Sequence, residues 1–150
     1  MRIPAALVVA ASATAVIALA VPVANAAAVP QVQITRIQYD SPGTDNRSVT
    51  SLNAEYVQLT NTTAKAVSLK GWTLRDNASH VYSFGNYTLA ARARVIVHTG
   101  PGTASAQHRY WQSKAYIWNN DRDAATLRNA AGRAIDSCSW ARPGRGFSVC

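Results

Sequence analysis

Residues 67–76 read Val67-Ser68-Leu69-Lys70-Gly71-Trp72-Thr73-Leu74-Arg75-Asp76. Apolar and polar residues alternate from Val67 to Lys70, and Gly71 ends this run. A second alternating run, which contains Trp72 and Leu74, follows directly. This pattern is typical of two short β-strands joined by a turn, because alternate side chains of a strand point to opposite faces. Polar turn residues follow at Asp76-Asn77-Ala78-Ser79, so the second strand is expected to end there.

Short alternating runs of the same kind continue on both sides of this stretch. Residues 56–60 alternate cleanly, and residues 125–128 lead into the turn residues Asn129-Ala130-Ala131-Gly132, which predicts a hairpin. At Thr35-Arg36 the alternation shifts by one position, which indicates a β-bulge. With a further strand expected at residues 116–118, the sequence predicts an all-β sandwich of about eight or nine strands with little helix.

Residues 1–26 predict a cleavable signal peptide. Arg2 precedes an apolar run over residues 5–20, and Ala24-Asn25-Ala26 supplies an A-x-A cleavage site. The alternative is a membrane anchor, since about 20 apolar residues span a bilayer. The alanine-rich run and Pro22 favour cleavage, which would give a secreted, extracellular protein with no stable membrane insertion. Loss of Arg2 would lower the formal net charge from +8 to +7.

The remaining chain is expected to hold one domain. Residues 27–31 form a short linker, residues 32–138 the β-domain, and residues 139–150 a C-terminal tail. Cys138 and Cys150 are the two cysteines, and in a secreted protein they favour one disulfide that ties the tail to the domain. The alternatives are two free thiols or a bridge between two molecules.

Five segments of the chain form a series in a fixed order. They are residues 55–62, 67–76, 80–84, 95–100 and 118–127, with Gly132 and Asp136 behind them. Together they resemble the lamin tail domain, over roughly residues 32–136. This resemblance implies an immunoglobulin-like β-sandwich that serves as an interaction module without catalytic residues. In bacteria such domains occur in secreted or surface proteins.

The chain departs from the family pattern at three places. Ala91-Arg92 stands where a Pro-Gly turn is usual, and Arg122 stands where glycine is common between two aspartates. A left-handed backbone is more costly for arginine than for glycine. The tail from residue 138 to residue 150 lies beyond the pattern. These differences predict altered loops and an unaltered fold.

Basic residues late in the chain are the main functional signal. One interpretation is a solvated surface that keeps the protein soluble. The other is a patch for polyanions such as DNA or acidic envelope polymers, and a protein partner is the alternative to these. The candidate polyanion-binding residues are Arg109, Arg128, Arg133, Arg142 and Arg145.

Tyr110 and Trp111 form an aromatic pair in a predicted long loop. They are candidates for a stacking platform for sugars or bases, and the alternative is a loop held by its own aromatic side chains. Asp121 and Asp123 place oxygen atoms at alternate positions, as calcium-binding loops do. An Asx-type turn is the favoured interpretation, because Arg122 between them opposes a cation. The three histidines show no metal spacing, so no metal or cofactor is predicted.

The sequence offers no set of residues typical of catalysis. Serine, histidine and aspartate occur without a nucleophile motif such as G-x-S-x-G. Glu55 and Asp76 would form a glycosidase pair only if the fold happened to bring them together, and Glu55 is expected at a strand edge. We therefore predict a secreted, non-catalytic binding or adhesion module, and the alternative is a small secreted hydrolase.

Overall fold

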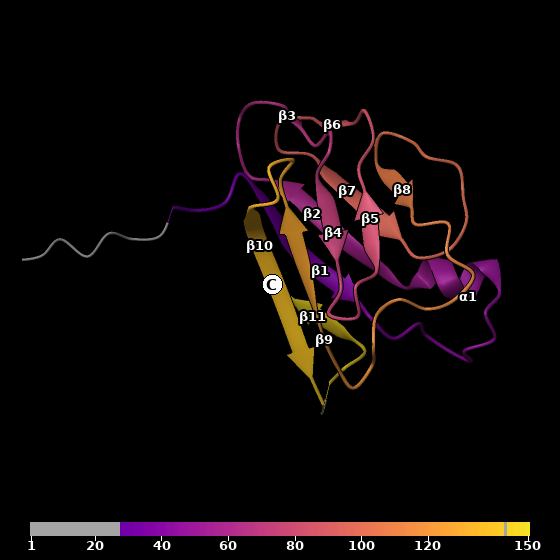
Figure 1. Cartoon of the computed structure of the whole chain (residues 1–150). Coiled ribbons are helices and arrows are strands. Elements are labelled where there is room, and N and C mark those ends of the chain that lie inside the picture. Colours follow the sequence, from indigo (N-terminus) through magenta and orange to yellow (C-terminus); the bar gives the residue numbers. More distant parts are fainter. Residues whose placement is uncertain (1–27, 143) are drawn as a thin grey trace, which may run out of the picture.

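The computed structural model describes residues 28–142 and 144–150, so the predicted signal peptide lies outside the described residues. In the described part, eleven short strands and one short helix build a two-layer β-sandwich (Figure 1). The all-β prediction is confirmed, although the strands outnumber the expected eight or nine. None of the helical residues in this part forms a segment long and apolar enough to cross a membrane.

Three sheets make up the fold. The five-stranded sheet has the order β11-β1-β2-β7-β8, the four-stranded sheet β10-β9-β4-β5, and β3 pairs with β6. All neighbours are antiparallel except β7 and β8, which are parallel. The strands are β1 (Val32–Gln38), β2 (Tyr56–Asn61), β3 (Val67–Ser68), β4 (Thr73–Arg75), β5 (Val81–Ser83), β6 (Thr88–Leu89), β7 (Arg94–His98), β8 (His108–Tyr110), β9 (Arg122–Arg128), β10 (Ala134–Ala141) and β11 (Phe147–Val149).

The core lies between the two larger sheets. Strand β2 alternates between half-buried and buried positions, so Val57 and Leu59 point inward and their neighbours point outward. Leu74 and Leu127 face them from the four-stranded sheet and are fully buried. Packing of two sheets through alternate residues leaves each sheet one outer face, and the outer face of the five-stranded sheet is central below.

The predicted bulge and hairpin are both confirmed. The register between β1 and β2 shifts between Ile34 and Arg36, and the amide of Ile34 donates to Asp136 Oδ2 of β10 at 2.8 Å. Strands β9 and β10 pair across the predicted turn. Gly132 has a positive φ in this turn, which glycine adopts without strain. The bulge therefore links the two sheets through a side chain.

The strand predicted at residues 116–118 is wrong. This segment is a loop, because the amides of Ile117 and Trp118 donate to the carboxylate of Glu55 at 2.8 and 3.3 Å instead of to a neighbouring strand. The sequence also missed α1 (Val49–Ala54), a short helix whose first turn is capped by Ser48 Oγ. A helix this short is too brief for a clear helical periodicity.

The expected C-terminal tail is part of the sandwich. Strand β10 runs on to Ala141, past the predicted domain end at residue 138, and β11 pairs with β1 at the edge of the other sheet. Cys138 and Cys150 form the predicted disulfide, with their Cα atoms 5.8 Å apart. Because Cys138 lies on β10 and Cys150 follows β11, this bond joins the two sheets.

The two unusual arginines behave differently. Arg92 has a positive φ, so it adopts the left-handed conformation that the family's glycine would take in this turn. Arg122 is the first residue of β9 and has no positive φ, so it avoids the left-handed conformation that would be costly for arginine. An arginine at the start of a strand needs no glycine-like freedom.

Candidate functional site

The five predicted polyanion-binding arginines do not form one patch. Arg128 and Arg133 flank the β9–β10 turn, where Arg128 Nη1 donates to the carbonyl of Gly132 at 2.9 Å. Arg142 and Arg145 follow the other end of β10. The length of β10 separates the two pairs by roughly 23 Å, given a rise of about 3.3 Å per residue. Arg142 is also ion-paired with the exposed Asp121.

Arg109 lies apart from both pairs and is committed to packing. It is opposite the buried Val97 in the β7–β8 ladder, so its side chain points to the inner side of the sheet. Its guanidinium carbon lies 3.9 Å from the centre of the Tyr87 ring, a cation–π contact. Burial raises the pKa of the Tyr82 and Tyr87 hydroxyls, and the charge of Arg109 partly opposes that effect.

Tyr110 and Trp111 do not form a shared stacking platform. Tyr110 ends β8 on the outer side, where its ring lies 5.0 Å from that of His98. Trp111 follows on the inner side and contacts Tyr82 and Trp118, each with ring centres 5.7 Å apart. Successive residues of an extended chain point to opposite faces, so the alternative interpretation holds for Trp111.

The acidic turn at Asp121 and Asp123 is built for backbone contacts. Asp123 is 1% exposed, and its carboxylate accepts the amides of Asn77, Asn119 and Ala124 at 2.8–3.1 Å. Asp121 instead faces Arg142 at the surface. The two carboxylates therefore do not converge as calcium ligands would, and the Asx-type interpretation explains Asp123.

His80 has a structural partner of the same kind. Its Nδ1 lies 2.5 Å from Asp76 Oδ2, and Asp76 Oδ1 accepts the amides of Ala78 and His80. The carboxylate of Asp76 is fully buried while the imidazole is half exposed. This arrangement holds the β4–β5 turn, so Asp76 is not available to act with Glu55.

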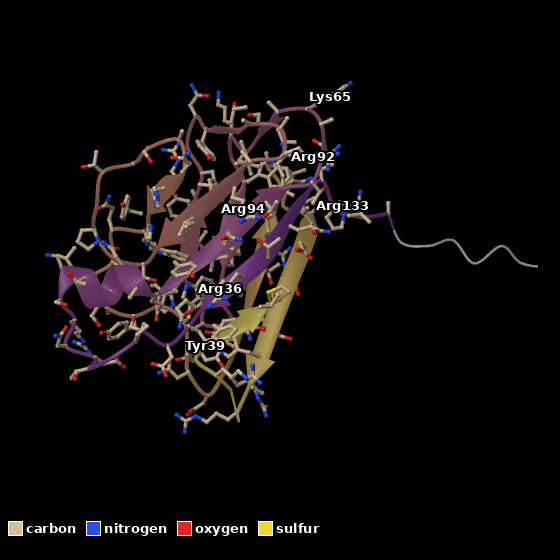
Figure 2. All side chains as sticks on the ribbon, turned by 180° about the vertical axis from the view of Figure 1, so that it is seen from behind. Arg36, Tyr39, Lys65, Arg92, Arg94 and Arg133 are labelled. Carbon is tan, nitrogen blue, oxygen red and sulfur yellow. A yellow bond between two sulfur atoms is a disulfide. The ribbon has the colours of Figure 1, made fainter. Side chains whose placement is uncertain are left out.

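The outer face of the five-stranded sheet is the strongest candidate for a binding surface, and it was not anticipated from the sequence. No residue of its five strands is acidic, whereas Arg36 and Arg94 point outward beside glutamines and threonines. Figure 2 looks onto this side and shows both arginines on the sheet, with Lys65 and Arg92 at one end. We call Arg36, Arg94, Lys65 and Arg92 the basic face.

The strand register sets the spacing of the two arginines on the sheet. Arg36 shares a cross-strand row with Gln58 and Ile96, while Arg94 lies two positions before Ile96 on β7. Arg36 and Arg94 are therefore two strands apart across the sheet and two residues apart along the strand direction, which gives a separation of roughly 12 Å between their Cα atoms. Their long side chains can therefore contact successive charges of one extended ligand.

The centre of this face is held in place by side-chain contacts. Thr35 Oγ1 lies 2.9 Å from Thr60 Oγ1 and accepts Gln58 Nε2 at 2.9 Å. Arg36 stacks on Phe147, with 4.2 Å between its guanidinium carbon and the ring centre, while its Nη2 reaches Gln38 Oε1 at 3.4 Å. An ordered guanidinium loses less side-chain entropy when it binds an anion.

Two histidines border the basic face. His98 Nδ1 lies 2.7 Å from the carbonyl oxygen of Asn53. A carbonyl oxygen can only accept, so Nδ1 carries the proton. His98 Nε2 then accepts from His108 Nδ1 at 2.9 Å. Burial and the nearby His108 lower the pKa of His98, so His98 adds no charge to the face at neutral pH.

Comparison with known families finds a match over most of the chain. The family model of the Lamin Tail Domain covers residues 25–142. The chain belongs to the lamin tail domain family. Comparison with curated proteins finds no match. The matched region ends just after β10, so it includes the start of the segment expected to lie beyond the family pattern.

Membership of the lamin tail domain family supports, in general terms, an immunoglobulin-like domain that is not catalytic.

The sequence analysis missed the basic face because its residues come from β1, β7 and two turns that are distant in sequence. One signal was present: the outward positions of residues 32–38, 56–61 and 94–98 contain arginine, glutamine and threonine but no acid. A count of acidic residues along each strand face would have found it.

Proposed function

We propose that this lamin tail domain is a secreted, non-catalytic binding module that holds an anionic polymer across the basic face. The observation that carries the proposal is the absence of acidic residues from all five strands of the sheet, combined with the outward Arg36 and Arg94. Of the acidic residues in the described chain, Glu55, Asp76 and Asp123 are buried. Asp40 follows the C-terminal end of β1, whereas the turns with Lys65 and Arg92 lie near the N-terminal end of this strand. The surface charge of this side is therefore positive.

The physical basis of the binding is electrostatic. A polyanion that contacts the basic face releases condensed counterions, so the association constant falls as the salt concentration rises. The hydrogen-bonded glutamine and threonine side chains at the centre of the basic face contain no base-reading arrangement, which favours recognition of charge over sequence. Lys65 and Arg92 lengthen the positive surface at one end of the sheet (Figure 2).

Secretion supports the choice of ligand. The predicted signal peptide would place the domain outside the cell, and the Cys138–Cys150 bond suits an oxidising environment. Acidic envelope or matrix polymers and free DNA are the polyanions that a secreted domain meets. A hydrolase gains no support, because the carboxylates of Glu55 and Asp76 are enclosed and hydrogen-bonded within the fold.

The test measures binding of residues 27–150 to labelled duplex DNA and to polygalacturonate over a salt series. Arg94 and Lys65 are exposed and have no side-chain partner among the described residues, so Arg94→Gln with Lys65→Gln should not disturb the fold. Each lost contact with a DNA phosphate reduces the magnitude of the slope of log K against log salt concentration by about 0.9. For duplex DNA, the slope of the double variant should therefore be smaller in magnitude by up to about 2.

A matched pair of variants tests the sequence-based alternative. Arg142→Gln with Arg145→Gln removes two exposed charges at the far end of β10 and should leave the slope unchanged. Absence of binding by the wild type at low salt would refute the proposed function. A larger effect of the Arg142 and Arg145 pair would move the site away from the basic face.

A further inference from the structure

A groove lies at the end of the molecule where residues 28–31, which precede β1, meet the β9–β10 hairpin. It has a volume of about 340 Å³ and is lined by Val29, Pro30, Trp72, Asn129, Arg133 and Ile135 among others. Sites for small ligands have volumes of about 300–1,000 Å³, with mostly apolar walls and a few polar groups that converge on the ligand. The groove has a volume within this range, and mostly apolar residues line it together with the polar Gln31, Asn129 and Arg133.

Trp72 gives the groove a rigid aromatic wall. Its backbone is fixed from two sides, since its amide donates to the carbonyl of Leu69 and its carbonyl accepts the amide of Phe84, both at 2.9 Å. The side chain packs against the core but remains partly exposed. Val29, which is 70% exposed, also lines the groove.

Asn129 and Arg133 supply polar groups to the groove, together with Gln31. Asn129 Oδ1 accepts the amides of Ala131 and Arg133 at 3.1 and 3.0 Å, which fixes the orientation of the side chain. Its Nδ2 donates to no other described residue and can therefore donate to a ligand. The exposed guanidinium of Arg133 has no ion pair within the described chain.

We infer that this groove binds one carboxylate-bearing sugar residue of an anionic polysaccharide. The apolar face of the sugar ring packs on Trp72, a hydroxyl accepts from Asn129 Nδ2, and the carboxylate pairs with Arg133. A guanidinium matches a carboxylate through two parallel hydrogen bonds. Single-stranded nucleic acid sites instead use several aromatic side chains for successive bases, whereas this groove has one.

The inference rests on the proposed function and specifies its ligand. Arg133 lies at the same end of the molecule as Lys65 and Arg92 (Figure 2), so one polymer can cross the basic face and place a sugar in the groove. The basic face then supplies attraction that any polyanion shares. The groove supplies the preference for an acidic sugar.

Tryptophan indole signals in a ¹H–¹⁵N NMR titration test this site. The chain has four tryptophans, and a Trp72→Phe variant assigns the signal of Trp72. Added trigalacturonate should shift this signal and the Arg133 amide in a saturable way, while the indole signals of Trp111, Trp118 and Trp140 stay in place. Trigalactose, which is neutral, and a short DNA strand at the same concentration should leave the Trp72 signal unshifted.

Two variants avoid dependence on a core residue. Arg133→Gln should weaken trigalacturonate binding roughly tenfold, as expected for the loss of a charged hydrogen bond. Val29→Asp places a negative charge in the lining of the groove and should also weaken the binding of trigalacturonate. Arg122→Gln, an exposed control at the opposite end of the four-stranded sheet, should have no effect.

The outcomes separate the two proposals. An unshifted Trp72 signal, while polygalacturonate still binds with a steep salt dependence, would overturn the groove alone. An equal shift with trigalactose or DNA would overturn the assignment of an acidic sugar. A failure of the wild type to bind any polyanion at low salt would refute the proposed function itself.

Discussion

Replacement of Glu55 by glutamine should change how the stability of the domain depends on pH. Glu55 is 1% exposed, and its Oε1 accepts Thr99 Oγ1 at 2.7 Å together with the amides of Ile117 and Trp118. Burial raises the pKa of Glu55 from 4.5 to about 7, although these three hydrogen bonds oppose the effect. A glutamine oxygen can accept the same hydrogen bonds without a charge.

The sign and size of the effect follow from proton linkage. The folded protein binds the Glu55 proton more tightly than the unfolded chain does, so this contribution to stability is fully present below about pH 4.5. It is lost as the pH rises through about 7. The difference between these two pKa values corresponds to about 3 kcal/mol, at about 1.4 kcal/mol for each pKa unit.

Urea unfolding of wild type and Glu55→Gln between pH 4 and pH 8.5 measures this difference. The unfolding free energy of the variant minus that of the wild type should rise by about 3 kcal/mol over this range. His98 acts in the opposite direction, since its lowered pKa makes stability fall below about pH 6.5, but both proteins contain it. Parallel curves for the two proteins would refute the reasoning.

The control is Asp121→Asn. Its side chain is 73% exposed and paired only with an exposed arginine. The loss of the Asp121 charge should therefore change the free energy of unfolding by less than about 1 kcal/mol. If this variant altered the pH dependence as much as Glu55→Gln, the effect would reflect net charge and not the burial of one carboxyl group.

Three further predictions concern stability and processing. Asn61→Ala should lower the unfolding free energy in urea titrations by about 2–4 kcal/mol, because the fully buried amide donates to the carbonyls of Lys65, Leu89 and Ala90. A loss below about 0.5 kcal/mol would contradict this. Replacement of both cysteines by serine should cost about 3 kcal/mol and reduce hydrogen-exchange protection in β11, whereas unchanged protection would show that strand pairing alone holds β11. Intact mass of the secreted protein should match a start near Ala27, and retention of residues 1–26 would refute cleavage.

Local patterns in the sequence were sufficient where neighbouring residues determine the structure. The β9–β10 hairpin follows from its turn residues with Gly132, and the bulge follows from the shift in alternation at Arg36. The prediction of a strand at residues 116–118 was wrong for the opposite reason. Its amides are taken by Glu55, which lies far earlier in the chain, and no local pattern reveals such a partner.

The candidate site shows the same limit. Arg128 and Arg133 flank the predicted β9–β10 turn, so the sequence alone places both at the same end of this hairpin. Arg142 and Arg145 could not be placed, since the length of β10 decides their distance from the turn. The basic face needs the pairing of β1, β2 and β7, which single-sequence patterns do not provide.

The disulfide between the sheets has a mechanical consequence. The N-terminal end of β1 and the C-terminal end of β11 lie on the same side of an antiparallel pair, so a pull on these ends would open β11 one hydrogen bond at a time. Cys150 directly follows β11, and its bond to Cys138 passes tension at that point into β10. The weak peeling route is thereby bypassed, and the load reaches the long β9–β10 pair of the opposite sheet.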